Sequence, residues 1–142
     1  CAAAMGSFIG SGCQNITHTS GDNTFIGGGV CNLTKANCSS IVGGFSSIAA
    51  GQCAAIDGGS CHTASGNRAF IGGGCENVVS HTDSSAMGTR ITSVSACTLH
   101  VNRLALSAGG LPTSDPGVPG VIWLSGGGAA AYGKYHLMVS NP

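Results

Sequence analysis

The sequence has little charge and few aromatic side chains. Among its 142 residues, five are Lys or Arg and five are Asp or Glu, while the aromatic residues are one Trp, two Tyr and four Phe. A chain with zero formal net charge and no basic cluster offers little to nucleic acid or anionic lipid, because both are bound through their phosphates. Its apolar runs are all shorter than the roughly 18 residues that span a bilayer. We therefore expect no nucleic-acid partner and no membrane insertion.

The sequence also lacks the motifs of common catalytic and cofactor sites. Its eight Cys include no Cys-x-x-Cys pair, which argues against a zinc ribbon or a redox motif. The acidic residues are too dispersed to predict a carboxylate pair for glycoside hydrolysis. There is no Gly-x-Ser-x-Gly elbow, and the glycine runs lack the Gly-Lys-Ser/Thr of a phosphate loop. We expect the protein not to be an enzyme and to have no cofactor and no metal site.

Glycine, by contrast, is abundant and regularly placed, with 25 residues in the chain. An apolar residue followed by Gly recurs at Ile9-Gly10, Ile26-Gly27, Val42-Gly43, Ile71-Gly72 and Met87-Gly88, with Ile56-Asp57 in the gap. The second members of these pairs follow one another at sequence steps of 17, 16, 14, 15 and 16. A second set, six positions before the later members, predicts turns at Gly21, Asn37, Gly51, Gly66 and Thr82. Gly and Asn adopt left-handed backbone conformations at a lower free-energy cost than other residues.

Each repeat predicts a short strand, a glycine-rich bend, a second short strand and a turn. Repeats of this size stack into a β-solenoid, in which every coil bonds to the next at about 4.8 Å. The fold class is therefore all-β. We expect three regions: β-roll repeats over 1–88, an extended neck over 89–108, and a C-terminal loop and hairpin segment over 109–142.

Neighbouring strand positions are often both apolar, as in Phe8-Ile9, Phe25-Ile26 and Phe70-Ile71. Because adjacent residues point to opposite faces of a strand, both faces of the sheet are expected to be shielded from water. Several identical chains packed together, most simply as a homotrimer, would cover the outer face. A monomeric solenoid with scattered exposed aromatics is the alternative. The residues predicted for the core and trimer interface are Phe8, Ile9, Phe25, Ile26, Ile41, Val42, Ile56, Phe70, Ile71, Met87, Leu99, Val101, Leu104 and Leu106.

The segments 41–51 and 56–66, Ile-Val-Gly-Gly-Phe-Ser-Ser-Ile-Ala-Ala-Gly and Ile-Asp-Gly-Gly-Ser-Cys-His-Thr-Ala-Ser-Gly, resemble the repeats of the YadA-like head of trimeric adhesins. The resemblance covers about residues 5–88 and implies a left-handed parallel β-roll. Asp57 departs from the glycine position of that pattern. The longest steps between repeats exceed the family's usual unit, so at least two loops are expected to bulge.

The chain beyond the roll predicts extended structure and then a hairpin. Leu99 and Val101 have one strand parity and Leu104 and Leu106 the other, so burying all four requires a bulge or twist near Arg103. After Gly- and Pro-rich loops, the segments 121–124 and 135–139 flank a stretch that begins with a Ser-Gly-Gly-Gly turn, which is typical of a β-hairpin.

Residues 98–106 followed by 111–123 resemble the shaft-to-tip segment of phage and large-virus tail fibres, which often precedes a trimerisation chaperone that is cleaved off. Together the two resemblances imply a structural and adhesive segment of a trimeric viral fibre on the virion surface. Its partners would be its own copies, other virion or fibre proteins, and a host-surface glycan or protein. The alternative is the head domain of a bacterial trimeric adhesin on the bacterial cell surface.

Six cysteines occupy corresponding places in adjacent repeats. Strands about 4.8 Å apart lie inside the Cα separation that a disulfide tolerates, about 4.4–6.8 Å. The candidate disulfides are Cys13 with Cys31, Cys38 with Cys53, and Cys61 with Cys75. The alternative is that these cysteines are reduced and fill a narrow interior as small hydrophobic side chains.

Ligand contacts are expected from loops, because the strands are occupied with burial and the glycine turns with geometry. The longest coils place extra residues at 15–20, 32–36 and 76–82. Trp123, Tyr132 and Tyr135 in the C-terminal segment are rigid aromatic candidates for ligand contact. With so little charge available, recognition is expected to rest on hydrogen bonds and stacking and to be largely insensitive to salt.

Overall fold

A computed structural model describes residues 4–104, 122–125 and 136–139 of the chain. The chain divides into two compact units at Arg103, and each is described by itself. The elements of both units are β-strands, and the parts that the structure describes contain no helix long and apolar enough to cross a membrane.

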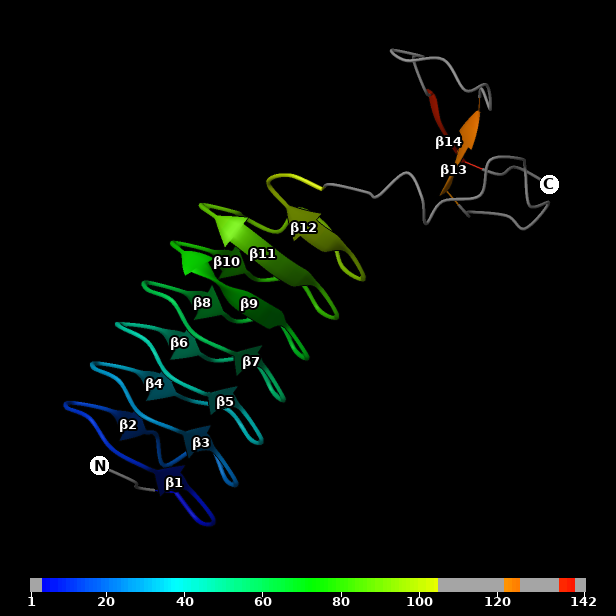
Figure 1. The fold of residues 1–142 in the computed structure, drawn as a ribbon. Helices are drawn as coiled ribbons and strands as arrows, with labels where there is room; N and C mark the ends of the chain where they lie inside the picture. Colours follow the sequence, from blue (N-terminus) through cyan, green and yellow to red (C-terminus); the bar gives the residue numbers. More distant parts are fainter. Residues whose placement is uncertain (1–3, 105–121, 126–135, 140–142) are drawn as a thin grey trace. The chain divides into compact units, whose positions relative to one another are not determined.

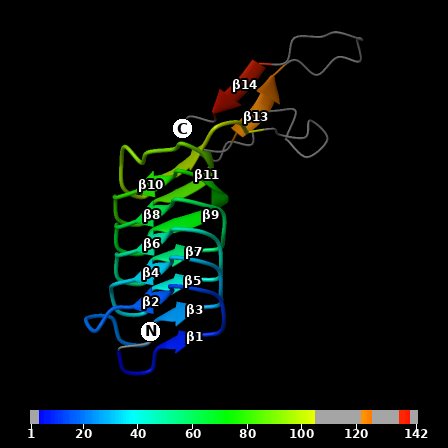
Figure 2. The same ribbon diagram turned by 90° about the vertical axis from the view of Figure 1, so that its left-hand side faces the viewer.

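The first unit is a parallel β-solenoid of about six coils (Figures 1 and 2). One sheet has seven strands: β1 (Phe8–Ile9), β3 (Phe25–Ile26), β5 (Ser40–Ile41), β7 (Ala55–Ile56), β9 (Phe70–Cys75), β11 (Ser85–Thr89) and β12 (Leu99–Val101). The second sheet has five: β2 (Ile16–Thr17), β4 (Leu33–Thr34), β6 (Ile48–Ala49), β8 (Thr63–Ala64) and β10 (Val78–Val79). The all-β solenoid predicted from the glycine repeat is confirmed.

The register of the coils differs from the predicted one at two places. Ile41 pairs with Ile26 and Ile56, so Val42 follows the isoleucine column instead of belonging to it. Met87 is displaced in the same way, because Ala86 pairs with Ile71. Ile41 is fully buried, so burial of the isoleucine, not the position of the next glycine, sets the register.

With this register, the coils of the first sheet are nearly uniform in length. The sequence offset between strand partners is 17 at the first step, 15 at each of the next four and 14 at the last. Only the first coil, 8–24, exceeds the common length, and its loop between β2 and β3 projects from the solenoid (Figure 2). The expectation that at least two loops bulge is therefore wrong, since one insertion accounts for the long step.

The solenoid interior is narrow and filled by small and β-branched side chains. Ile26, Ile41, Ile56 and Ile71 form one fully buried column. Opposite them, the inward positions of the second sheet carry Thr17, Thr34, Ala49, Ala64 and Val79, all fully buried. Each buried isoleucine stabilises the fold by about 1.5–3 kcal/mol relative to an exposed one.

A column of polar side chains runs through the same interior and was not predicted. The Asn32 amide donates to the carbonyls of Gly28 (3.1 Å) and Gly44 (2.9 Å), and its Oδ1 accepts the backbone N–H of Ser47 (3.1 Å). Asn77 repeats this pattern with Gly73, Gly88 and Ile91. Each asparagine thus joins its own glycine bend to the next coil. The repetition of Asn15, Asn32 and Asn77 at one coil position is the signal that could have revealed the column.

Each coil turns two corners, and one non-glycine residue at each corner has a left-handed backbone, with φ between 53° and 58°. One corner column is Gln14, Cys31, Ser46, Cys61, Glu76 and Arg90, and the other is Asn23, Cys38, Cys53, Arg68, Asp83 and Cys97. The turns predicted near Gly51 and Gly66 are present, but these glycines do not carry the left-handed conformation. A Cβ at Gly51 would collide with the carbonyl oxygen of Gly66, so close approach of the next coil explains the glycine there.

The solenoid extends beyond the predicted boundary at residue 88. Thr92 bridges to Val78, and Leu99 pairs with Ser85, so residues 89–101 complete a coil and begin another rather than forming an extended neck. The last step is one residue short at the glycine bend, which hid the repeat, but Ile91 and Ser93 still occupy buried positions. The predicted bulge near Arg103 involves Leu106, which lies outside the described residues.

The second unit contains an antiparallel pair, β13 (Ile122–Ser125) and β14 (His136–Val139), in which Ile122 pairs with Val139 and Ser125 with His136. The two strands of the predicted hairpin are therefore confirmed. The predicted turn and the preceding loops lie outside the described residues.

Candidate assembly and attachment surfaces

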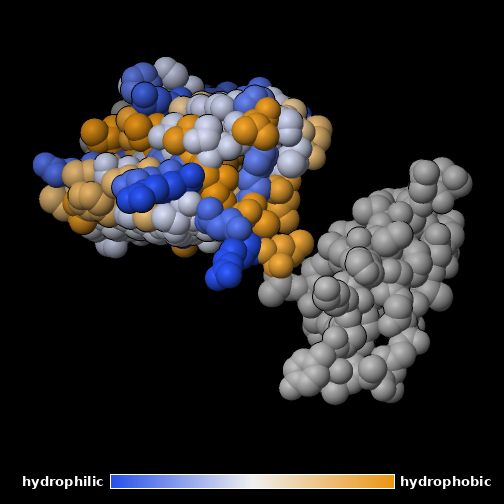
Figure 3. All heavy atoms as spheres, turned by 90° about the horizontal axis from the view of Figure 1, so that it is seen from above, coloured by the Kyte–Doolittle hydropathy of each residue, from blue (hydrophilic) through white to orange (hydrophobic). Residues whose placement is uncertain are grey.

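The outward side of the seven-stranded sheet carries several exposed apolar side chains, and we call it the first-sheet face. It consists of two columns, Phe8, Phe25, Ser40, Ala55, Phe70, Ser85 and Leu99, and, two positions later, Gly10, Gly27, Val42, Asp57, Gly72, Met87 and Val101. Phe8, Val42, Met87 and Leu99 are 51–57% exposed. In Figure 3 hydrophobic atoms, drawn in orange, gather in patches on the outside of the solenoid.

In the first six strands of this face a large side chain in one column is accompanied by a small one in the other, whereas Leu99 and Val101 are both large. A Cβ at Gly27 would lie 3.4 Å from the Phe25 ring, and a Cβ at Gly10 would lie 3.2 Å from the Phe8 ring, so each ring covers the glycine two positions later. Where the first column carries Ser or Ala, the second carries Val, Asp or Met. The Phe8 and Phe25 rings stack with centroids 5.7 Å apart and planes 7° from parallel, within the favourable range for aromatic pairs.

The residues predicted for the core and trimer interface divide between the two sides of the sheet. Ile26, Ile41, Ile56 and Ile71 are fully buried inside the solenoid, and Ile9 is half-buried against them. Phe8, Phe25, Val42, Met87, Leu99 and Leu104 are exposed, while Phe70 and Val101 are half-buried. Leu106 lies outside the described residues. The predicted pairing of an inner with an outer apolar position is thus present in the single chain.

Further apolar side chains lie outside the first-sheet face. On the outward side of the second sheet, Ile16 is 46% and Val78 36% exposed, and Leu33 and Ile48 lie between them in the same column. The bend that connects the sheets adds Val30 and Phe45, which are paired with each other across adjacent coils. The solenoid therefore has apolar surface on more than one side.

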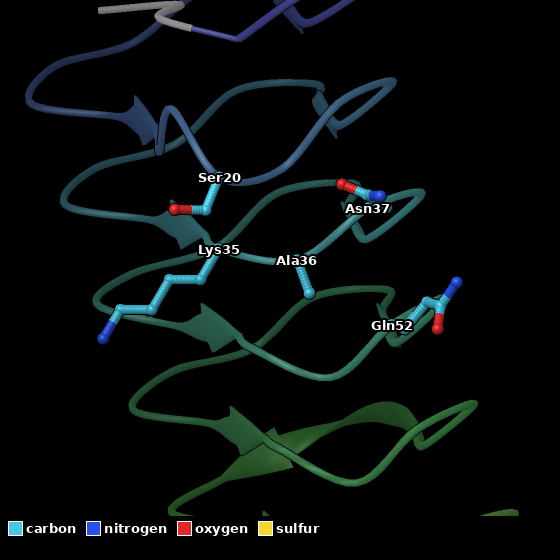
Figure 4. Close-up of a pocket in the computed structure, with 5 residues that line it drawn as sticks. All are labelled: Ser20, Lys35, Ala36, Asn37 and Gln52. Carbon is cyan, nitrogen blue, oxygen red and sulfur yellow. The ribbon is translucent and has the colours of Figure 1, made fainter.

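A shallow hollow of about 290 Å³ lies beside the long first coil, lined by Ser20, Lys35, Ala36, Asn37 and Gln52 (Figure 4). Ser20 belongs to the extra residues of the first coil. Asn37 Oδ1 accepts the backbone N–H of Asp22 at 3.0 Å, and this hydrogen bond holds Asn37 against the first coil. Lys35 points away from Asn37 and Gln52 (Figure 4).

The predicted ligand loops are only partly brought together in this hollow. Loops 15–20 and 32–36 supply Ser20, Lys35 and Ala36, whereas loop 76–82 is not part of it. Asn37 and Gln52 were not predicted to contact a ligand. Asn37 was predicted only as a turn residue, and Gln52 follows the turn predicted at Gly51. A hydroxyl, two amides and one ammonium can hydrogen-bond a neutral or weakly anionic polar ligand.

Trp123, Tyr132 and Tyr135 belong to the second unit. The backbone of Trp123 pairs with that of Met138 in the β13–β14 ladder. Tyr132 and Tyr135 lie outside the described residues. Their role in ligand contact therefore stays a prediction.

The titratable residues that the structure describes include no group of three that could hold a metal ion. His62 is fully buried in the polar column, where Nδ1 accepts the backbone N–H of Asn77 at 3.2 Å. Nε2 therefore carries the proton and faces the carbonyls of Gly58 and Gly74 without reaching good hydrogen-bonding geometry. Burial lowers the pKa of His62 more than these carbonyls raise it. This histidine is a structural group.

The ion pairs are exposed and lie along the corner columns. Arg68 binds Asp83 through two contacts of 2.5 and 2.7 Å, and Arg90 binds Glu76 at 2.8 Å. The hydrogen bond from Arg68 lowers the pKa of Asp83. Exposed pairs of this kind add little to stability.

The seven described cysteines are free thiols. All are exposed or half-buried, so the alternative that they fill the solenoid interior is wrong: Ile, Ala, Thr and Asn occupy the inward columns. Cys38 and Cys53 share one position of adjacent coils. The other two candidate pairs are offset by one residue, because Cys13 pairs with Val30 and Cys75 pairs with Ser60.

Comparison of the chain with protein-family models, with curated proteins and with solved structures finds no match.

Proposed function

We propose that this protein is a structural and adhesive segment of a trimeric viral fibre. The observation that carries the proposal is the first-sheet face, which exposes Phe8, Phe25, Val42, Met87 and Leu99 on a solenoid whose interior is already filled. The resemblance of residues 41–51 and 56–66 to left-handed trimeric β-roll heads supports it. Residues 98–106 followed by 111–123, which resemble viral tail fibres, favour a virion surface over the alternative, the head of a bacterial surface adhesin.

A second copy of the chain is a suitable cover for this face. Exposed apolar patches of this size often mark an interaction surface. Another copy has the same coil spacing of about 4.8 Å, so side chains of two parallel copies can stay in step along the whole face. A cyclic trimer uses two different surfaces of each chain, and the apolar columns on the second sheet and the bend supply the other surface.

The assembly is tested by light scattering of the purified protein and of a Phe25→Asp variant. Wild type is expected at three times the 13.8 kDa chain mass. Phe25→Asp is expected to be monomeric with unchanged β-sheet circular dichroism, because Phe25 lies outside the core. Gln52→Asp, an exposed change in a turn outside both sheets, is the matched control and should remain trimeric. A stable wild-type monomer would overturn the assembly.

Adhesion is tested by binding to host cells and glycan arrays at low and high salt. We expect weak single contacts strengthened by three copies and largely insensitive to salt, because only Lys35 brings charge to the hollow. Tyr132→Ala, Tyr135→Ala and Gln52→Ala separate the aromatic candidates from the hollow. Loss of binding at moderate salt contradicts this mode of recognition, and electron microscopy of the native particle distinguishes a virion fibre from a bacterial adhesin.

A further inference from the structure

Cys38 and Cys53 occupy the same corner position of two adjacent coils. Their φ angles are 58° and 56°, and each donates its backbone N–H to the preceding coil, Cys38 to Asp22 and Cys53 to Asn37, both at 3.0 Å. Because the two residues have the same backbone conformation one coil apart, their Cβ atoms leave the solenoid in nearly the same direction. Both side chains are exposed.

The next two members of this column show that side chains at the corner meet across one coil step. Arg68 and Asp83 have the same sequence separation as Cys38 and Cys53, and their side chains contact each other at 2.5 and 2.7 Å. At the other corner, Cys31 and Cys61 are separated by Ser46, and the Cys31 thiol donates to Gln14 Oε1 at 3.1 Å. Only one pair of the described cysteines therefore occupies neighbouring places in one column.

We propose that Cys38 and Cys53 are an oxidation site at which a disulfide joins the second and third coils. Adjacent coils about 4.8 Å apart lie within the Cα separation of about 4.4–6.8 Å that disulfides show, and the Cβ atoms need to approach by a few tenths of an ångström to reach about 4.5 Å. The inference does not rest on the proposed function, because both residues belong to one chain.

The oxidant is a small-molecule disulfide such as oxidised glutathione. One thiol loses its proton to solvent, and its sulfur attacks the glutathione disulfide, which forms a mixed disulfide and releases one glutathione thiolate. The second cysteine, also deprotonated, attacks the protein sulfur of the mixed disulfide and releases the second glutathione thiolate. Two cysteine thiols are oxidised, and one glutathione disulfide is reduced to two thiols.

The test treats the native protein with oxidised glutathione, blocks remaining thiols and digests it without reduction, using a protease that cleaves after Phe45. Because Phe45 lies between Cys38 and Cys53 in the sequence, the two peptides stay together only through a disulfide. We expect linked peptides from wild type and from the matched control Cys31→Ser. Cys38→Ser should abolish the link and leave Cys53 as a glutathione adduct.

The same oxidation in denaturant provides a second measurement, because an unfolded chain does not hold the two thiols together. The yield of the Cys38–Cys53 link relative to all other links should fall at least tenfold. Linked peptides that persist in Cys38→Ser, an equal yield in the unfolded chain, or a link between two copies of the protein would overturn the proposal.

Discussion

His62 is the one member of the interior polar column that leaves a nitrogen poorly satisfied. Asn32 and Asn77, at the same coil position, each donate two hydrogen bonds to glycine-bend carbonyls, whereas Nε2 of His62 only faces the carbonyls of Gly58 and Gly74. The column thus tolerates an imidazole at a cost in hydrogen bonding, since an unmet buried donor is expensive.

Replacing His62 by Asn is expected to stabilise the solenoid. An amide at this position repeats the contacts of Asn32 and Asn77, and gaining satisfied hydrogen bonds is worth on the order of 1 kcal/mol in the free energy of unfolding. Asn77→Ala, which removes three hydrogen bonds, should change the free energy in the opposite direction. Urea denaturation followed by circular dichroism measures both. A less stable His62→Asn protein would show that the ring's packing outweighs its hydrogen bonding.

The free energy of unfolding of the wild type is expected to decrease when the pH is lowered below about 6.5. Burial makes the pKa of His62 lower in the folded chain than its ordinary value of 6.5, so the unfolded chain binds the proton more tightly. The free energy of unfolding is therefore independent of His62 above this pH and decreases as the pH drops below it. The measurement compares urea midpoints at about pH 7.5 and about pH 5.5 in wild type and His62→Asn. An equal loss in both proteins would assign the effect to other groups.

Asp83 titrates in a separate window. The hydrogen bond from Arg68 lowers the pKa of Asp83 below 3.8, so its contribution to stability is present above that pH and is lost only in stronger acid. The His62 effect can therefore be read without interference from this pair.

At the scale of the coil, two different constraints favour glycine: a left-handed backbone and the close approach of the next coil. They fall on different residues. Ser46 has φ of 53° although it carries a side chain, and a left-handed conformation costs an L-residue roughly 1–2 kcal/mol. Gly51 is not in that conformation, but the next coil approaches it so closely that a Cβ would collide with the Gly66 carbonyl. The sequence pattern alone does not distinguish the two constraints.

The two constraints predict opposite effects of substitution. Ser46→Gly relieves the left-handed strain but loosens the unfolded chain, for a net stabilisation of roughly 0.5 kcal/mol. Gly51→Ala should destabilise by about 1–3 kcal/mol, because the backbone of the adjacent coil must move. Thermal and urea unfolding of the two variants check this. If Gly51→Ala were as stable as wild type, the coils would be free to separate at that corner.

The repeat was predictable because isoleucine and glycine recur at regular intervals. This recurrence was enough to predict the solenoid fold and the inner and outer apolar positions of its strands. The register at Val42 was missed because the sequence offers both Ile41 and Val42 for the interior, and only burial decides. The left-handed residues at the corners were missed because Cys, Arg and Asp occupy positions where Gly or Asn is expected. The last coil was missed because its glycine bend is one residue shorter. Gln52 joins the hollow only through the stacking of coils, which no local pattern reports.

For the whole molecule, the proposed trimer places Asp57 in a special position. It is the only charged residue among the described residues of the first-sheet face, and Val42 and Gly72 occupy the same column in the neighbouring coils. In a trimer that covers this face, three carboxylates would lie at or near a dry interface, where a charge is costly. Asp57 therefore weakens the assembly relative to an apolar residue.

Asp57→Val is accordingly expected to strengthen the trimer. Valine matches the side chain of Val42 one coil away, and removing the carboxylates should tighten association by about tenfold, equivalent to about 1.4 kcal/mol. Sedimentation or fluorescence dilution series measure the dissociation midpoint of wild type and variant. Gln52→Val adds the same apolar side chain outside the first-sheet face and should leave the midpoint unchanged. If both variants associated equally, the gain would come from general hydrophobicity. If Asp57→Val dissociated at the same concentration as wild type, the first-sheet face would not be the surface through which the chains assemble.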